Sequence, residues 1–318
     1  MKKFKLSHVA YVPDAGDGYS LVTTSISSTG AGLFLYVANE ASSAVHEQEN
    51  HGFGIFPKPK MVAAATFRLL VCDGRQLKAV DIGETDFTFP FVEMFPDGRV
   101  LLISARCQWR SENDFDLNGL IYDPKTKKHS PFLVGDGVEG VSIDERGRIW
   151  VSYFDEGVFG NYGWANPGPR CIGEMGLNCF NDQGEIIWRF QPPENGPQID
   201  DCYAMNIVGA NAFIYFYSDF PLCSIDENFE LRFRTTELSG SHAFAIDDNS
   251  ALFSCQYDEP PSRFHHMSLE EDKLNKISEI EVVLPNGDPV LDGRLIARGR
   301  HIHFFDEHSW YRGDIREL

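Results

Sequence analysis

The chain has 318 residues, of which 42% are hydrophobic, 13% aromatic and 24% charged, so it can bury a large core and does not have the composition of a disordered chain. The formal net charge of −19 and the sequence pI near 4.9 disfavour binding to nucleic acid or to an anionic membrane. No apolar run is long enough to span a bilayer, and the basic start of the chain lacks the features of a secretion signal. We therefore expect a soluble, cytoplasmic protein whose acidic surface either maintains solubility or steers a basic partner.

Seven cysteines are scattered along the chain without a CxxC pair. An odd, scattered set is typical of buried thiols in a reducing compartment and not of a disulfide framework or a zinc site. Several stand in apolar strand patterns, such as LFSCQY and GLNCFN, where cysteine acts as a small apolar residue. The seven are Cys72, Cys107, Cys171, Cys179, Cys202, Cys223 and Cys255.

The stretch 137–163, GVEGVSIDERGRIWVSYFDEGVFGNYG, predicts two β-strands joined by a tight turn. The first strand ends at Ile143, the turn occupies Asp144–Gly147, and the return strand begins at Ile149. Gly147 stands where a short hairpin loop needs a positive φ. After the second strand we expect a loop rich in glycine, aromatic and acidic residues.

This hairpin recurs along the chain. Similar pairs of apolar strands turn near Gly30, at Asp97-Gly98, near Gly209, at Asp247–Ser250 and near Gly299. Between them, a second kind of hairpin pairs a short apolar strand with a charged one, as in FRLLVCDGRQLKAVDI and GLNCFNDQGEIIWRF. In SLEEDKLNKISEIEVV a helix is the alternative, but the β-branched end favours a hairpin. Two hairpins make a four-stranded unit, and the units recur at intervals of roughly 40–60 residues, the range of propeller blades.

The two chain ends predict how the repeat closes. Only HSWYRGDIREL follows Asp306, enough for one strand, and the N-terminal FKLSHVAYV is a strand without a hairpin partner. Pairing the two would complete the last unit and remove an exposed sheet edge. We therefore predict one all-β domain over 1–318, a six-bladed β-propeller closed by the N-terminal strand, with seven blades as the alternative.

The repeated hairpins, particularly DGRVLLIS and ERGRIWVSYFD, resemble those of the six-bladed β-propellers of the NHL, YWTD and SMP30/gluconolactonase type. The resemblance covers essentially the whole chain. It implies a central channel lined by the innermost strands and a binding face built from loops at one rim. The segment YFDEGVFGNYGW looks like the signature of a single family, but it carries no recognisable activity.

Acidic and aromatic residues recur at comparable positions in the inner hairpins. Glu139, Tyr203 and His242 align near the start of the innermost strand, with Asp292 close to the same level. The second strands end in an aromatic residue followed closely by an acid, as in Tyr153–Asp155, Tyr217–Asp219, Tyr257-Asp258 and Phe305-Asp306. One interpretation is an acidic mouth formed by Glu139, Asp155, Glu156, His242, Asp258 and Asp292.

Such a mouth could bind a divalent cation through oxygen ligands, or a cationic group with Tyr153, Tyr203 and Trp164 as aromatic faces. The alternative is structural, because acids and tyrosines at strand ends commonly hydrogen-bond to loop backbones. The resemblance to SMP30-type lactonases implies a glutamate, asparagines and an aspartate around calcium, but here only Glu139 and Asn206 stand at comparable positions. A lyase with His242 as the base is a further hypothesis.

Other motifs do not build a site. His301 and His303 alternate on one strand and could share a metal ion, but no third ligand can be placed, which favours a structural role. The adjacent His265 and His266 would point to opposite faces of a strand. We find no glycine-rich phosphate loop, no GxSxG and no Cys/His nucleophile pair.

Two long insertions, Asn39–Lys60 and Glu156–Met175, each join an inner hairpin to its outer one. Both should therefore emerge on the same side of the propeller. Long loops in compact domains are often functional, and the second insertion carries Phe159, Tyr162 and Trp164 as candidate interface anchors. The alternative is that its aromatic residues fold back over the blade as a packed loop.

The incomplete catalytic set, the acidic surplus and the two insertions favour a non-enzymatic binding propeller without a cofactor. It would engage a protein partner, such as a basic protein in an inhibitor or immunity-type role, or a small ligand, through its loop-bearing face. The expected binding residues are Tyr153, Asp155, Glu156, Phe159, Tyr162, Trp164, Tyr203 and Asp258. The alternative is a metal-dependent hydrolase, lactonase or lyase in the central channel, with catalytic residues Glu139, His242 and Asp292 and a divalent cation such as calcium.

Overall fold

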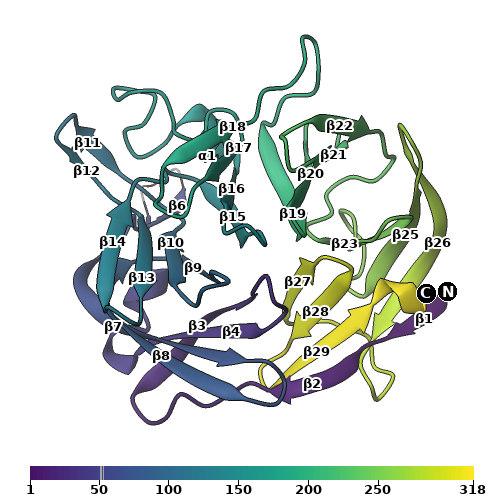
Figure 1. Cartoon of the computed structure of the whole chain (residues 1–318), viewed down its shortest axis with the longest axis horizontal. Coiled ribbons are helices and arrows are strands. Elements are labelled where there is room, and N and C mark those ends of the chain that lie inside the picture. The colour runs from purple at the N-terminus through teal and green to yellow at the C-terminus, as the bar shows by residue number, and fades with distance from the viewer. Residues whose placement is uncertain (51, 53) are drawn as a thin grey trace. The chain divides into compact units, whose positions relative to one another are not determined.

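The computed structural model describes residues 1–50, 52 and 54–318, so residues 51 and 53 of the first predicted insertion lie outside the described part. The strands form the six blades of a β-propeller, as predicted, and not seven (Figure 1). By its internal contacts the chain divides into two compact units, unit 1 (Met1–Val12 and Pro192–Leu318) and unit 2 (Pro13–Gln191). The expectation of a single domain stays a prediction.

Unit 2 contains blades one to three, each a four-stranded antiparallel sheet with its strands in chain order. Blade one comprises β3 (Tyr19–Ile26), β4 (Gly32–Ala38), β7 (Lys60–Cys72) and β8 (Leu77–Phe87). Blade two comprises β9 (Pro90–Met94), β10 (Val100–Ser104), β13 (Gly119–Asp123) and β14 (Lys128–Phe132). Blade three comprises β15 (Val138–Ile143), β16 (Ile149–Tyr153), β17 (Leu177–Phe180) and β18 (Ile186–Arg189).

Unit 1 contains blades four to six. Blade four comprises β19 (Asp201–Val208), β20 (Asn211–Tyr217), β21 (Leu222–Ile225) and β22 (Leu231–Arg234). Blade five comprises β23 (Phe244–Ile246), β24 (Ser250–Phe253), β25 (Arg263–Leu269) and β26 (Leu274–Val283), so the segment with a helical alternative is a hairpin. Blade six contains β27 (Arg294–Arg298), β28 (His301–Phe305) and β29 (Ser309–Asp314), followed by the 3-10 helix η3 (Ile315–Glu317).

The N-terminal segment forms two strands and not the single strand predicted. β2 (Ser7–Tyr11) pairs antiparallel with β29 and completes blade six, which confirms the predicted closure. β1 (Lys2–Lys5) adds instead to blade five, parallel to β26. The chain passes between the two sheets at Leu6, which is buried with Phe4 in a core shared by these blades. The N-terminal segment therefore ties blade five to blade six.

Aspartate side chains stabilise several of the tight turns between paired strands. In blade three the buried Asp144 accepts hydrogen bonds from the main-chain nitrogens of Arg146 and Arg148, both at 2.9 Å, and from the Trp150 indole at 3.1 Å. Gly147 closes this turn with φ of 79°, as predicted. Turns that begin at Asp73, Asp97, Asp123, Asp226, Asp247 and Asp306 use the same aspartate-to-backbone hydrogen bond.

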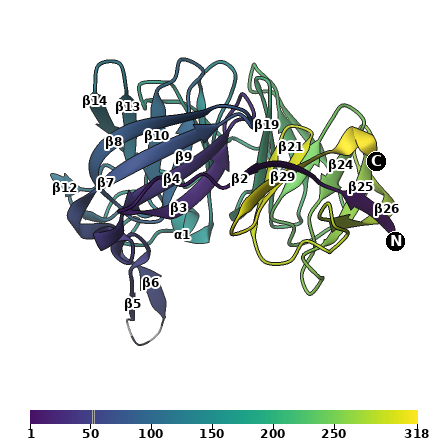
Figure 2. The same ribbon diagram turned by 90° about the horizontal axis from the view of Figure 1, so that it is seen from below.

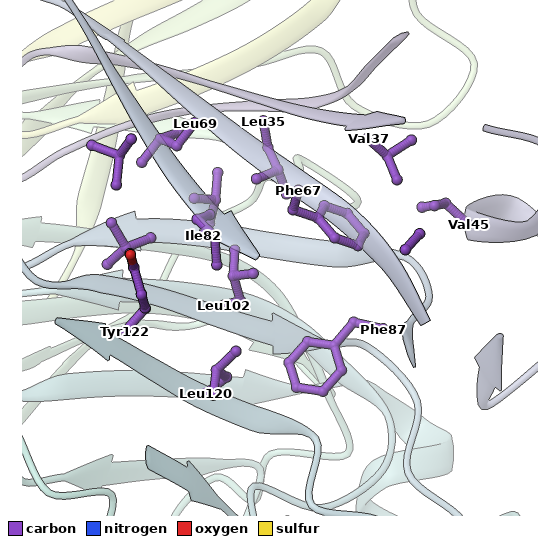
Figure 3. Packing of buried hydrophobic residues seen from close by; sticks show 14 of the residues in the cluster. Leu35, Val37, Val45, Phe67, Leu69, Ile82, Phe87, Leu102, Leu120 and Tyr122 are labelled. Atoms are coloured by element: carbon purple, nitrogen blue, oxygen red, sulfur yellow. The ribbon is translucent and has the colours of Figure 1, made fainter. Parts of the chain in front are cut away.

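Apolar side chains from neighbouring blades interlock to form the core. Figure 3 shows the cluster between blades one and two, where Leu35, Phe67 and Ile82 meet Leu102 and Leu120. A second cluster joins blades two and three, and two further clusters lie within unit 1. These contacts between sheets remove each blade's apolar faces from water.

The connections from inner to outer hairpins in unit 2 carry small elements of their own. The first holds the 3-10 helices η1 (Asn39–Ala41) and η2 (Ala44–His46) and the hairpin of β5 (Gln48–Asn50) and β6 (Ile55–Pro57). The second holds β11 (Trp109–Ser111) and β12 (Asp114–Phe115), and the third holds helix α1 (Asp155–Phe159), where the sequence predicted only a loop. Figure 2 shows β5 and β6 extending away from the blades of unit 2. None of the helices among the described residues has the length and apolarity to cross a bilayer.

Candidate functional site

Three connections of unit 2, at 39–59 (as described, without residues 51 and 53), 105–118 and 154–176, contact one another, and we call them the loop-bearing face. The Tyr162 hydroxyl donates to the Pro57 carbonyl oxygen, which joins the third connection to the first. The Trp109 nitrogen donates to Tyr162 O at 2.9 Å, and the Trp164 indole donates to Cys107 O at 2.8 Å, which joins the third connection to the second. These contacts confirm that the two predicted insertions emerge on the same side, and they add a third connection that the sequence analysis missed.

Arg106 is the centre of the loop-bearing face, with only 2% of its side chain exposed. Its Nη2 atom lies 2.5 Å from Glu156 Oε2 on α1 and 3.0 Å from Asp136 Oδ2. The guanidinium carbon lies 4.5 Å from the centre of the Tyr162 ring and 5.3 Å from that of Phe154. The cation is therefore held between two carboxylates and two aromatic faces, which fastens the third connection to the end of blade two.

Asp136 is the most perturbed acid of this cluster. Burial raises the pKa of its carboxyl group to about 7, although Arg106 opposes that shift. Its Oδ1 atom accepts a hydrogen bond from the Cys107 nitrogen at 2.8 Å, whereas Oδ2 makes the ion pair with Arg106 but no well-aligned hydrogen bond to the described residues. Because Arg106 and Asp136 are both buried, we interpret the cluster as a fastening of the loops and not as the surface that meets a ligand.

Each of the same three connections carries exposed apolar side chains. Phe159 at the end of α1 is 63% exposed. Ile55, Phe115 and Leu117 are also exposed, from the first and second connections. The surface therefore combines a fixed backbone with apolar side chains in water.

Two of the predicted binding residues of blade three lie inside the structure. Tyr153 is fully buried and its hydroxyl donates to Val134 O at 2.8 Å. Trp164 is buried against Cys107 and Cys171. Of the two alternatives for these residues, the structural one describes both, because neither ring is available to a ligand. Asp155 is exposed, but Glu156 is engaged by Arg106 and does not stand free in an acidic mouth.

Unit 1 contains a cluster of five aromatic side chains that we call the aromatic patch: Tyr203, Tyr217, Phe220, His242 and Tyr257. The His242 ring stacks on Tyr203, with centroids 5.0 Å apart and planes at 17°. Phe220 meets Tyr203 edge to face at 5.1 Å and Tyr217 at 5.7 Å. The Tyr203 and Tyr257 hydroxyl groups are hydrogen-bonded to each other. The structure thus brings together two of the residues that the inner-hairpin alignment placed at the same level, Tyr203 and His242.

The backbone around the patch is arranged to hold these rings. Gly240 has φ of 76°, and a Cβ there would lie 2.7 Å from the Tyr257 ring, so the ring rests on the glycine. Asp219, Phe220 and Asp258 also have positive φ, which is rare for residues other than glycine and is concentrated at functional sites. Tyr217 and Tyr257 remain 48% and 50% exposed, so the patch presents ring surface to solvent.

The side chains named for the enzyme alternative belong to different units. Glu139 is exposed on β15 in unit 2, whereas the exposed His242 and Asp292 precede β23 and β27 in unit 1. Although His242 is exposed, partial desolvation of its ring lowers the pKa and favours the neutral imidazole. Within the described ranges, no group of three or more His, Cys, Asp or Glu side chains is arranged to hold a metal ion.

The other histidines have structural partners. His303 is buried, its Nδ1 accepts from the Trp310 indole at 3.1 Å, and burial lowers its pKa to about 3. His265 is buried with its Nε2 2.6 Å from Glu259 Oε2. The contact of His303 agrees with the structural role expected for its pair, and His265 is engaged by Glu259.

Comparisons with known proteins find one partial family match and several distantly similar structures. Residues 177–312, less than half of the chain, match the model of the YxzG family. No curated protein matches the chain in sequence. Similar solved structures include a catalytically inactive virginiamycin B lyase from Staphylococcus aureus with quinupristin, at 9% identity over 98% of this chain and 99% of that chain, with a TM-score of 0.44. Another is the β-propeller domain of the Trilobed protease from Pyrococcus furiosus, at 10% identity over 94% of this chain and 82% of that chain, with a TM-score of 0.46. A third is a gluconolactonase from Xanthomonas campestris, at 10% identity over 97% of this chain and 98% of that chain, with a TM-score of 0.42. At these identities and scores we draw no argument about activity from them.

Proposed function

We propose that this protein is a non-enzymatic binding propeller that engages a basic protein partner through the loop-bearing face of unit 2. The observation that carries the proposal is that three connections fastened to one another each expose apolar side chains. Large apolar side chains exposed together on a soluble protein commonly mark an interaction surface. Phe159 is the expected central anchor, since it is the large aromatic side chain that this face exposes most.

The fastening of the loops favours binding because association costs less when a surface is already ordered. The Arg106 cluster and the Tyr162 contact fix the third connection before any partner arrives. Binding therefore does not have to order a long flexible loop, which lowers the entropic cost of association.

The charge of the chain favours a basic partner. With a formal net charge of −19, the protein attracts positively charged proteins over distances comparable to the Debye length, and salt screens this attraction. Polar groups line the face as well, since Lys58 pairs with Glu47 at 2.8 Å and Lys60 lies 3.6 Å from Asp116. The combination of an apolar anchor with a charged rim is common in protein interfaces.

Affinity capture with matched variants tests the proposal. The full chain is immobilised and exposed at low salt to a lysate of its native host. The test variant is Phe159→Ser with Phe115→Ser, and the control is Ile187→Ser with Leu77→Ser, which changes two exposed apolar residues on outer strands of the same unit. We expect a specific protein of basic pI that the control still captures and that the test variant captures at least tenfold less well. Capture of no specific protein, or equal capture by the two variants, would contradict the proposal.

A further inference from the structure

The aromatic patch of unit 1 combines exposed ring surface with acidic side chains. Its rings come from four short segments, 200–204, 217–221, 240–243 and 255–260, and these contain five acidic residues and no lysine or arginine. Asp258 directly follows Tyr257, Asp219 lies two residues after Tyr217, and both aspartates are exposed. An aromatic surface flanked by carboxylates attracts organic cations through the ring quadrupole and through ion pairing.

The rings are held in place, and Tyr203 and His242 favour their uncharged forms. Hydrogen bonding to Tyr257 and burial raise the pKa of the Tyr203 hydroxyl, so the phenol stays neutral. Partial desolvation lowers the pKa of His242, which disfavours a positively charged imidazole that would repel a cation. Gly240 supports the Tyr257 ring from one side, and Tyr203 and Phe220 meet it edge to face. The patch is therefore a preorganised surface.

We propose that the aromatic patch binds an arginine side chain of a basic protein partner. Arginine fits better than lysine, because its planar guanidinium group can stack on a tyrosine ring while its N–H groups donate to neighbouring carboxylates. Tyr217 and Tyr257 supply the ring surface, and Asp219 and Asp258 supply the carboxylates. This inference concerns a surface other than the loop-bearing face, so it stands or fails independently of the function proposed above.

Binding of short labelled peptides to the full-length protein tests the inference directly. The probe is the peptide Gly-Arg-Gly-Arg-Gly carrying a fluorescent label, measured by anisotropy at low salt. The comparison peptides replace arginine by lysine or by citrulline, which is planar like arginine but uncharged. We expect the arginine peptide to bind at least fivefold more tightly than either.

Variants locate the binding on the patch. Tyr257→Leu should weaken binding of the arginine peptide at least fivefold, whereas Tyr257→Phe retains the ring and should stay within twofold of the unmodified protein. Asp219→Asn with Asp258→Asn should also weaken binding of the arginine peptide, because this double variant removes both carboxylate charges and keeps every ring. The control Tyr11→Leu changes a tyrosine on β2 that is 75% exposed and should have no effect.

Several results would overturn the inference. Equal affinity for the arginine and lysine peptides would show general attraction to an acidic protein. Equal affinity for the citrulline peptide, or no binding of any peptide, would exclude recognition of guanidinium. The double variant Phe159→Ser with Phe115→Ser should bind the arginine peptide as tightly as the unmodified protein does. The peptide assay therefore tests the aromatic patch separately from the function proposed for the loop-bearing face.

Discussion

Substitution of Asp136 by asparagine is expected to change how the stability of the protein depends on pH. In the native protein this carboxyl group is buried beside Arg106, with Oδ1 accepting from the Cys107 nitrogen at 2.8 Å. Asparagine has the same shape and can retain that hydrogen bond, but it cannot ionise. The variant therefore removes one titration and leaves the packing nearly unchanged.

The magnitude follows from the raised pKa of Asp136. Burial moves the pKa from its ordinary value of 3.8 to about 7, so the folded protein holds the proton more tightly than the unfolded chain does. The stability that this proton supplies is fully present below the unfolded pKa and is lost as pH rises through the folded one. Between pH 5 and pH 8 the loss is about 2–3 kcal/mol for the unmodified protein. Asp136→Asn should not show this loss.

Urea unfolding followed by tryptophan fluorescence at pH 5 and pH 8 measures the effect. Comparing variant with unmodified protein at each pH removes the contribution of the other titrating groups. We expect the variant to gain about 2–3 kcal/mol relative to the unmodified protein on going from pH 5 to pH 8. A difference that does not change with pH would refute the reasoning. A change of opposite sign would show that pairing with Arg106 outweighs burial.

Two further substitutions test the two sites. Arg106→Met should cost about 3–5 kcal/mol of unfolding free energy, because it leaves Asp136 and Glu156 without their shared cation. A loss below about 1 kcal/mol in urea unfolding would show that the cluster does not fasten the connections to one another. Gly240→Ala should both destabilise the protein and weaken binding of the arginine peptide, because a Cβ at this position meets the Tyr257 ring at 2.7 Å. The matched control is Gly18→Ala, which has a similarly positive φ but open space around the Cβ, so it should cost only the backbone strain of about 1–3 kcal/mol and leave peptide binding unchanged. Unchanged peptide binding in both glycine variants would contradict the role of Tyr257.

The repeated hairpins could be predicted from the sequence because their determinants are local. The turn at Asp144–Gly147 depends on one aspartate side chain, one glycine with positive φ and two apolar runs, all within a few residues. Apolar runs around a short turn likewise located the other inner hairpins, whose turns contain an aspartate, a glycine or both. The pairing of β2 with β29 followed from a second local fact, the absence of a partner for each chain end.

The parallel pairing of β1 with β26 could not be predicted in the same way. The sequence FKLSHVAYV contains no turn residue at Leu6, where the chain passes from one sheet to the next. The passage of the chain from blade five to blade six at Leu6 is favoured by burial of Phe4 and Leu6 in the core of these two blades. Such a tertiary preference leaves no local pattern.

The candidate sites were only partly predictable for the same reason. Tyr203 and His242 were aligned correctly because both stand at the start of an inner hairpin. Arg106, Asp136 and Glu156 come from three different loops, and nothing in their spacing indicates that one guanidinium group joins them. Trp164 and Tyr153 looked like ligand-facing aromatics because composition alone does not distinguish a packed loop from an exposed one.

The central claim is that a protein partner docks on the loop-bearing face, and hydrogen–deuterium exchange with the captured partner tests it most directly. Backbone amides in the three connections, at 39–59, 105–118 and 154–176, should exchange more slowly in the complex than in the free protein, most strongly around Phe159. Peptides from the outer strands β8 and β18 should be unchanged. Slower exchange confined to β8, β18 or other segments away from these connections would contradict the account.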